Sequence, residues 1–339
     1  MKAMRLHEIE GPESLVYEDV PEPEPGPGEI VVRLHNAALN RRDVFITRGM
    51  YPGAKADALP VTLGSDGSGE VAARGDGADG PSEGTEVVIN PALHWGDNPR
   101  VPGKEYRILG LPDDGTFAQF VKAPADHVFP KPSHLSHKEA AAIPLAALTA
   151  YRALVTRGEV REGETVVIPG IGGGVATFLV QMAAALGTRV FVTSGSDEKI
   201  EKAKELGAEG GVNYNSKNWS KELRSMTGGV DLSVDSIGGE VFDALLSMAN
   251  PGSRIVTFGA TAGPVPKLVM PKIFLFKQLD ILGTAMGTPE EFGAMLDLYQ
   301  ERGLRPVINE RFPLEETTAA MQHMEEGAGI GKIVLDIPA

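Results

Sequence analysis

The segment 164–207 limits the possible folds of this chain more than any other part of the sequence. Its residues, ETVVIPGIGGGVATFLVQMAAALGTRVFVTSGSDEKIEKAKELG, predict a strand, a glycine-rich turn, a helix, a second strand and a second helix. Thr165–Ile168 is apolar on both faces, as in a buried parallel strand. Most positions of the turn at 170–176 lack a Cβ, and the following helix offers free N–H groups to a pyrophosphate. Because the correct elements flank the turn, we interpret it as dinucleotide-binding and not as a tight turn without a ligand.

Strands and helices continue to alternate as far as residue 284, which predicts an α/β fold with a doubly wound parallel sheet. The predicted strands are 165–168, 189–193, 211–213, 231–235, 253–258 and 280–284, and the predicted helices are 175–186, 197–206, 218–226 and 240–249. Residues 1–130 read as short strands and loops, with a long loop at 91–114. A capping box formed by Ser136 and Glu139 begins a helix that should break at Pro144. Helices at 289–302 and 315–326 and a strand at 332–337 follow.

Composition excludes several classes of function. The 339 residues suffice for two domains, and the net charge of −14 argues against binding to nucleic acid. The chain has no cysteine, which excludes disulfides, thiolate metal ligands and a cysteine nucleophile. It has no apolar run of about 18–20 residues and no apolar core near Met1, so we expect no membrane partner and a cytoplasmic protein.

The end of the second strand of the alternating region bears on the choice of cofactor. Folds that bind NAD usually place an acidic residue there, which repels a 2′-phosphate. Here the strand ends in small hydroxyl residues, no acid appears before Asp197, and Lys199 follows. This pattern favours NADP(H) over NAD(H). The alternative for Lys199 is a solvated lysine paired with neighbouring glutamates.

The full-length pattern resembles the medium-chain dehydrogenase/reductase family, in particular its zinc-free quinone oxidoreductase-like branch. The motifs that carry the resemblance are PGPGE at 25–29, NRRD at 40–43, GMYP at 49–52, LGSDGSG at 63–69, DGTFAQF at 114–120, DSIG at 235–238, TFG at 257–259 and GKIVL at 331–335. The resemblance implies a Rossmann domain at 147–285. A GroES-like β-rich catalytic domain would comprise 1–146 and 286–339, with the active site in the cleft between the domains. It also implies a homodimer that forms through the sheet edge near 280–284.

Carried over position by position, the resemblance implies which residues form the site. Asn40 and Tyr51 are the candidate catalytic residues. The expected cofactor-binding residues are Thr149, Gly172, Gly173, Gly174, Val175, Ser194, Gly195, Lys199, Tyr214, Ser236, Phe258 and Gly259. The positions of the zinc ligands in zinc-dependent members match Asn40, Ser65 and Leu145, and the loop at 91–114 lacks the four cysteines of the structural zinc lobe. We therefore expect no metal.

Without zinc as a Lewis acid, acceptors that delocalise the incoming charge are favoured, namely quinones and α,β-unsaturated carbonyls. The expected function is NADPH-dependent hydride transfer to such a small-molecule substrate. Tyr51 is either a proton donor or a packing residue. The alternatives are an NADPH-binding protein with incidental turnover, as in lens crystallins, and an aldehyde/alcohol dehydrogenase-type reductase.

Other patterns receive structural interpretations. The YPGAK run that begins at Tyr51 has the Tyr-x-x-x-Lys spacing of short-chain dehydrogenases, but its Pro-Gly pair prevents a shared helix face, so we attribute it to chance. His134 and His137 have the spacing of a metal pair, but a helix start is favoured because no clear third ligand follows. Trp95 either caps the cleft or anchors its loop. The apolar stripe 270–276 lines the pocket, packs internally or contacts another subunit.

Overall fold

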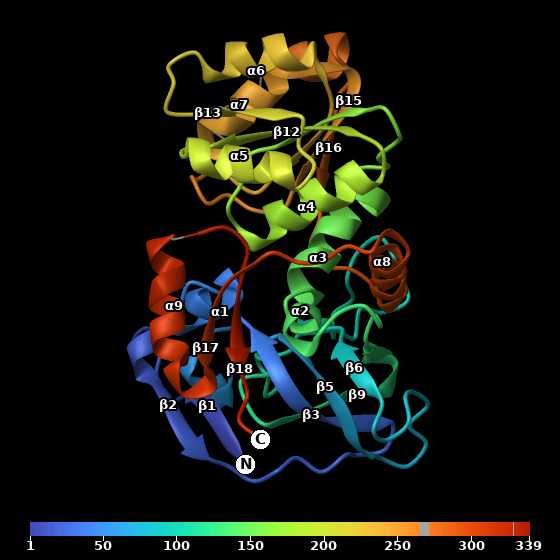
Figure 1. Ribbon diagram of the computed structural model, residues 1–339, viewed down its shortest axis with the longest axis vertical. Coiled ribbons are helices and arrows are strands. Elements are labelled where there is room, and N and C mark those ends of the chain that lie inside the picture. Colours follow the sequence, from blue (N-terminus) through green and yellow to red (C-terminus); the bar gives the residue numbers. More distant parts are fainter. Residues whose placement is uncertain (265–270, 328) are drawn as a thin grey trace. The chain divides into compact units, whose positions relative to one another are not determined.

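The computed structural model describes residues 1–264, 271–327 and 329–339 of the chain (Figure 1). Met270, at the start of the apolar stripe, lies outside these residues. The chain forms two compact units. Unit 1 comprises Met1–Leu148 and Gly287–Ala339, and unit 2 comprises Thr149–Met286. The sequence predicts domain boundaries at 146/147 and 285/286. The units divide at 148/149 and 286/287.

Unit 2 contains a six-stranded parallel sheet with the order β13-β12-β11-β14-β15-β16, which confirms the predicted doubly wound α/β fold. If β11 is counted as the first strand, this order is 3-2-1-4-5-6, and the order reverses between β11 and β14. The strands are β11 Thr165–Ile168, β12 Arg189–Ser194, β13 Gly210–Asn213, β14 Val230–Asp235, β15 Ala249–Thr257 and β16 Asp280–Gly283.

The helices of unit 2 connect these strands and pack on the sheet. They are α4 Gly174–Ala185, α5 Asp197–Glu205, α6 Trp219–Thr227 and α7 Gly239–Met248, with π-helical turns at Arg152–Arg157 and Pro271–Phe276. Helix α4 lies against β11 and β12, and α5 lies against β12 and β13. Apolar residues from the strands, α6 and α7 form one buried cluster, to which Val167, Phe191 and Phe242 contribute.

Unit 1 is built on a mainly antiparallel sheet with the order β10-β6-β5-β3-β18-β17, and β9 also pairs with β3. A smaller sheet has the order β2-β1-β4, and β7 pairs with β8. The strands are β1 Lys2–Leu6, β2 Leu15–Asp19, β3 Glu29–Ala38, β4 Val61–Thr62, β5 Asp66–Arg74, β6 Glu86–Ile89, β7 Ala92–Leu93, β8 Arg107–Ile108, β9 Phe120–Pro124, β10 Val128–Pro130, β17 Ile308–Pro313 and β18 Lys332–Asp336. Strands β7 and β8 correct the prediction that 91–114 is loop throughout.

The helices of unit 1 are α1 Arg41–Thr47, α2 His137–Ala141, α8 Pro289–Arg302 and α9 Thr317–Glu326, and α3 Pro144–Tyr151 begins in unit 1 and ends in unit 2. Short 3-10 turns lie at Pro12–Ser14, Ala56–Ala58, Ala125–His127 and Leu314–Glu316. The capping box is confirmed, since the Ser136 N–H donates a hydrogen bond of 2.9 Å to the Glu139 carboxylate. The break at Pro144 is confirmed because α2 ends three residues before α3 begins.

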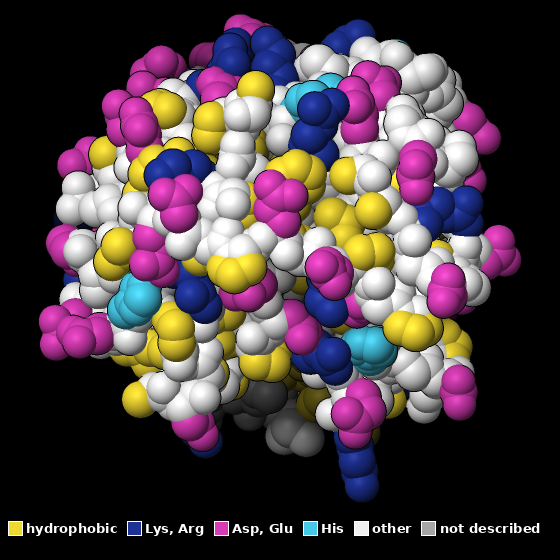
Figure 2. Space-filling view, turned by 90° about the horizontal axis from the view of Figure 1, so that it is seen from below, with side chains coloured by type: hydrophobic (Ala, Val, Ile, Leu, Met, Phe, Trp, Pro, Cys, Tyr) yellow, Lys and Arg dark blue, Asp and Glu magenta, His cyan; other side chains and the backbone are white. Residues whose placement is uncertain are grey.

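Charge is dispersed over the one face of the molecule that Figure 2 shows. On the face shown in Figure 2, Lys and Arg side chains lie singly or in small groups among Asp and Glu side chains, and no continuous basic stripe crosses it. Across the described ranges, no helix combines the length and apolarity that a membrane crossing needs.

Candidate functional site

A cavity of about 680 Å³ lies at the carboxyl ends of the strands of unit 2. The turn after β11 forms one wall, and residues that follow β12, β13, β14 and β15 form the others. Ligands of doubly wound sheets bind at this edge, beside the point where strand order reverses. The lining residues are Gly170, Ile171, Thr193, Ser194, Gly195, Ser196, Lys199, Tyr214, Asn215, Ile237, Val241, Thr261 and Ala262.

The glycine turn lets a charged side chain approach its backbone. Gly172 has φ of +139°, and a Cβ at this position would lie 3.3 Å from Nζ of Lys199. The ammonium group therefore lies beside the turn, where any residue larger than glycine would crowd it. Helix α4 begins immediately afterwards, with Gly173 as its N-cap. A cation and the N-terminus of a helix thus lie near each other, as suits an anionic ligand.

The end of β12 forms the second polar wall. Ser196 is the N-cap of α5, and its hydroxyl accepts a 3.4 Å hydrogen bond from the Lys199 N–H. A Cβ on Gly195 would lie only 2.7 Å from the Tyr214 hydroxyl, so glycine lets the tyrosine lie across the strand end. Among the described residues that line the cavity, Lys199 is charged and none is a carboxylate. The carboxylate of Asp197 lies 2.8 Å from the Asn213 amide instead.

A buried carboxylate lies behind another part of the cavity wall. Asp235, the last residue of β14, accepts hydrogen bonds from the N–H groups of Ile237 at 2.9 Å and of Gly238 at 3.1 Å. Burial raises the pKa of the Asp235 carboxyl, while these N–H groups oppose that shift. The loop that places Ile237 in the cavity wall is fixed by these bonds.

Four of the cofactor-binding residues expected from the sequence line the cavity: Ser194, Gly195, Lys199 and Tyr214. Residues Gly172–Val175 form the adjoining turn and the start of α4. Ser236, Phe258 and Gly259 lie in the loops after β14 and β15 but do not line it, and Thr149 is buried with its hydroxyl 3.7 Å from Sδ of Met286. Sequence reasoning missed several lining residues, although the rule that ligands bind at strand ends points to them: Thr193, Asn215, Ile237, Thr261 and Ala262.

In unit 1, Asn40 belongs to a buried polar cluster at the ends of three strands. Lys332 Nζ donates to Asn40 Oδ1 at 2.6 Å, to Asp66 Oδ2 at 2.9 Å and to the Leu39 carbonyl at 2.6 Å. The Asn40 amide in turn donates to Asp66 Oδ2 at 2.9 Å. These bonds use all three protons of the Lys332 ammonium group. They also fix the Asn40 amide, with its oxygen toward Lys332 and its nitrogen toward Asp66.

Tyr51 lies against a different cation. The guanidinium of Arg42 is centred 4.7 Å from the Tyr51 ring and donates to Ser65 Oγ at 3.1 Å and to the Leu109 carbonyl at 3.2 Å. Trp95 is buried in its loop and donates to the Asn98 carbonyl at 3.0 Å. It therefore anchors the loop at 91–114, one of the two roles considered for it.

The residues at the family's zinc positions do not suit zinc. Asn40 Oδ1 is bound to the Lys332 ammonium, Ser65 donates to a backbone carbonyl at 2.8 Å, and Leu145 offers only its backbone N–H, to Asp66 at 2.8 Å. Zinc needs three or four convergent nitrogen, sulfur or carboxylate ligands. A lysine ammonium already neutralises the carboxylate that lies here.

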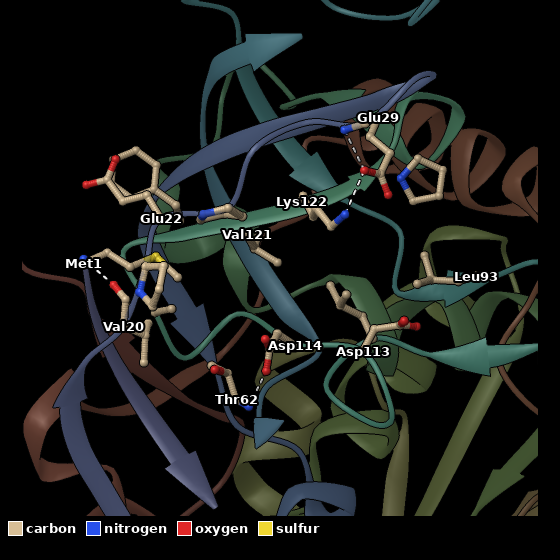
Figure 3. Close-up of a pocket in the computed structure, with 18 of the residues that line it drawn as sticks. Met1, Val20, Glu22, Glu29, Thr62, Leu93, Asp113, Asp114, Val121 and Lys122 are labelled. Carbon is tan, nitrogen blue, oxygen red and sulfur yellow. Dashed lines mark hydrogen bonds and ion pairs between the residues drawn. The ribbon is translucent and has the colours of Figure 1, made fainter. Parts of the chain in front are cut away.

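A larger hollow of about 870 Å³ lies in unit 1 between the proline-rich turn at 21–28 and β9. Figure 3 shows that three of its charged groups, Lys122, Glu29 and Asp114, are paired with other residues of the wall. Lys122 donates to Glu29 at 2.9 Å, and Asp114 accepts from the Thr62 N–H at 2.7 Å. Neither Asn40 nor Tyr51 lines it. The cavity of unit 2 is therefore the better candidate despite its smaller volume.

Known proteins match the chain along its whole length. The family model for zinc-binding dehydrogenases matches residues 174–301, and that for the alcohol dehydrogenase GroES-like domain matches residues 26–133. A "Zinc-type alcohol dehydrogenase-like protein YogA" of Leptosphaeria maculans is 34% identical over 94% of this chain and 93% of its own. A "Quinone oxidoreductase" of Pseudomonas aeruginosa is 31% identical over 96% of each.

Solved structures extend the match to the fold. A crystal structure described as an NAD-dependent alcohol dehydrogenase superposes with a TM-score of 0.93 at 39% identity and covers 100% of both chains. A mycobacterial protein complexed with NADPH superposes with a TM-score of 0.83 at 28% identity, over 99% of this chain and 100% of its own. These two similar structures differ in the cofactor that their descriptions name.

Proposed function

The chain belongs to the medium-chain dehydrogenase/reductase family, and from this premise we propose that it is an NADPH-dependent reductase. Its substrate would be a quinone or an α,β-unsaturated carbonyl, reduced without zinc. The observation that carries the proposal is the cavity wall in which Lys199 lies beside the glycine turn and no carboxylate faces the same space. A ribose with a 2′-phosphate fits such a wall, whereas NAD-specific sites of this fold usually present an acid to the ribose diol.

The residues present suit each part of the cofactor. Lys199, Ser194 and Tyr214 supply a cation and hydroxyls for the 2′-phosphate, and the N–H groups of Gly173, Gly174 and Val175 suit the pyrophosphate. Thr149, Ser236, Phe258 and Gly259 are proposed to border the nicotinamide part. When bound, the cofactor supplies the hydride.

Substrate binding is proposed to involve Asn40, with Tyr51 in a supporting role. Lys332 holds the carbonyl end of the Asn40 amide and Asp66 holds its amino end, so the amide keeps one orientation. A preoriented N–H group can bind a carbonyl oxygen of the acceptor without rearrangement. Asn40, Ser65 and Leu145 offer zinc no adequate ligand set, so the acceptor itself must delocalise the charge.

The test is a pair of measurements on the full-length protein. Dissociation constants for NADPH and NADH are measured by quenching of intrinsic fluorescence, and we expect NADPH to bind at least tenfold more tightly. Consumption of NADPH is then followed with quinones, enones, aldehydes and ketones, and we expect turnover with the first two classes. Tighter binding of NADH, or oxidation of secondary alcohols as the main activity, would contradict the proposal.

Two alternatives remain as outcomes of this test. The 39% identity to a protein described as an NAD-dependent alcohol dehydrogenase favours alcohol oxidation. Tight NADPH binding with no turnover on any acceptor would instead support a cofactor-binding protein with incidental activity.

We also propose that the chain forms a homodimer through β16. This strand lies at the edge of the parallel sheet, where its backbone groups can pair with a second copy. The segment before it exposes Phe274, Leu275 and Phe276, of which Phe276 is 79% exposed. A second copy would cover this apolar surface.

A further inference from the structure

We propose that unit 1 carries a binding site for a divalent transition ion of the zinc class at His35, Glu70 and His137. One ligand atom from each residue lies within 4.8 Å of the other two. The site shares no residue with the cofactor cavity or with the positions matching the family's zinc ligands, so it is independent of the proposed catalytic function.

The fold brings the three side chains together from three elements. His35 lies in β3 where the register with β5 shifts between Leu34 and Asn36. Such a bulge re-aims the side chain at its centre. Glu70 lies on the neighbouring β5, and helix α2 packs against both strands and contributes His137 at its first position. The two imidazole rings lie 4.4 Å apart between centroids.

The hydrogen bonds of the two histidines suit metal binding. His35 Nε2 is shielded from solvent and lies 3.3 Å from Glu70 Oε1. Donor atoms bound to one tetrahedral zinc, each at about 2.0–2.1 Å, are separated by about 3.3 Å. In His137, Nδ1 lies 3.0 Å from Ser68 Oγ and Nε2 lies 3.1 Å from Glu86 Oε1. An ion bound at one of these nitrogens would replace the contact made there, and the other nitrogen would keep a partner that orients the ring.

The charged groups beside the two histidines leave one carboxylate oxygen facing them. Arg33 donates to Glu70 Oε2 at 2.8 Å, and Lys131 lies 3.2 Å from Glu86 Oε2. These cations occupy the other carboxylate oxygens, so Glu70 Oε1 remains for the ion. Two imidazoles and one carboxylate match the preferences of Zn²⁺, with a water in the fourth position.

His134, which has metal-like spacing from His137 in the sequence, is not a member of this site. His134 Nε2 lies 2.8 Å from the Leu304 carbonyl, so its side chain is directed to that carbonyl and not toward His137. The third ligand that the sequence did not reveal comes from β5, far from α2 along the chain. A spacing pattern along one helix could not identify it.

The test is a titration of the full-length protein with ZnCl₂, after treatment with EDTA, in competition with a chromogenic chelator. We expect one ion per chain at pH 7.5 and at least tenfold weaker binding at pH 6, where protons compete for the imidazoles. His35→Gln and His137→Gln should each weaken binding at least tenfold. The matched control is His7→Gln, which alters another histidine–glutamate pair, with 2.8 Å to Glu18, and should leave binding unchanged.

Circular dichroism of each variant shows whether it folds. X-ray absorption at the zinc edge of the wild-type complex gives a readout independent of substitution and should show two imidazole ligands. Absence of stoichiometric binding, binding unaffected by both substitutions, or a spectrum without imidazole would overturn the proposal. None of these results depends on NADPH or on turnover, so the failure of this site is distinct from failure of the proposed activity.

Discussion

Lys332 Nζ lies 2.6 Å from Oδ1 of Asn40, and the same ammonium group lies 2.9 Å from the carboxylate of Asp66. All three residues are buried, so the ion pair is shielded from water. Removing one member of a buried pair leaves the other charge uncompensated, at a cost of about 3–5 kcal/mol. The pair therefore links the stability of unit 1 to the orientation of the proposed substrate-binding amide.

Lys332→Met should lower the free energy of unfolding by about 3–5 kcal/mol because Asp66 loses its counterion. Urea denaturation at pH 7.5 measures this change. The double variant Lys332→Met/Asp66→Asn removes both charges and should recover more than half of the loss. A double variant no more stable than the single one would show that the two charges are not coupled.

Lys199→Ala should weaken NADPH binding by ~1–3 kcal/mol, the scale of a charge-assisted hydrogen bond, and leave NADH binding unchanged. The physical reason is that the lysine suits only the 2′-phosphate, which NADH lacks. Fluorescence titration with both cofactors measures the two changes. Lys202→Ala is the control, since this lysine of α5 pairs with Glu205 at 2.7 Å outside the cavity. Equal losses for both cofactors would contradict the assignment of Lys199.

The contrast between Tyr51→Phe and Tyr51→Ala separates packing from proton donation. Phenylalanine keeps an aromatic face beside the Arg42 guanidinium, whose central carbon lies 4.7 Å from the centroid of the Tyr51 ring. We expect turnover of the phenylalanine variant within twofold of wild type and a lower unfolding midpoint for the alanine variant. Steady-state kinetics and thermal denaturation measure these outcomes. A fall of about 10²–10⁴-fold in kcat for Tyr51→Phe would establish the hydroxyl as a general acid.

The sequence predicted the elements whose signals are local. The strand Thr165–Ile168 and the helix Pro289–Arg302 begin and end as expected, the first because it is a short apolar run and the second because a capping box and a proline define its start. The sequence predicts a strand at 63–73 that is interrupted by Gly64, Gly67 and Gly69, and the observed strand begins at Asp66. Gly64 has φ of +98°, which breaks the extended backbone before that point.

Parts of the site that depend on distant residues could not be predicted. Lys332 and Asp66 are separated by 266 positions in the chain. No local sequence pattern around either residue predicts that the other is its partner. The same holds for His35 and His137, which meet only because α2 packs on β3 and β5. In contrast, Lys199 and the glycine turn lie within one βαβ unit, whose geometry the alternation already specifies.

Phe276→Asp should convert the proposed dimer to a monomer because it places a charge in the apolar surface beside β16. Size-exclusion chromatography with light scattering measures the mass, which should fall from about twice the 35.9 kDa of the chain to that value. Met50→Asp is the control, since Met50 is an exposed apolar residue of unit 1, at 62%, and its substitution should leave the mass unchanged. A wild-type protein that is already monomeric would refute the proposed association.

The titration of Asp43 should make unit 1 less stable as the pH rises through the weakly acidic range. Burial raises the pKa of this carboxyl to about 6 from its ordinary value of 3.8, although Arg42 and the Asn40 N–H oppose the shift. Between these two values the folded state binds more protons than the unfolded state. The contribution of Asp43 to the free energy of unfolding is therefore greatest below about pH 4 and declines until about pH 6, by roughly 1.4 kcal/mol for each unit of pKa difference.

Asp43→Asn removes this titration and still offers an oxygen to the Asn40 N–H, which donates to Asp43 Oδ2 at 2.7 Å. Urea denaturation of both proteins at pH 4, 5, 6 and 7 isolates the effect, since other groups contribute equally to each. The stability of the wild type relative to the variant should fall with pH up to about 6 and remain constant above it. A difference that does not change with pH would show that Asp43 titrates at its ordinary value in the folded protein.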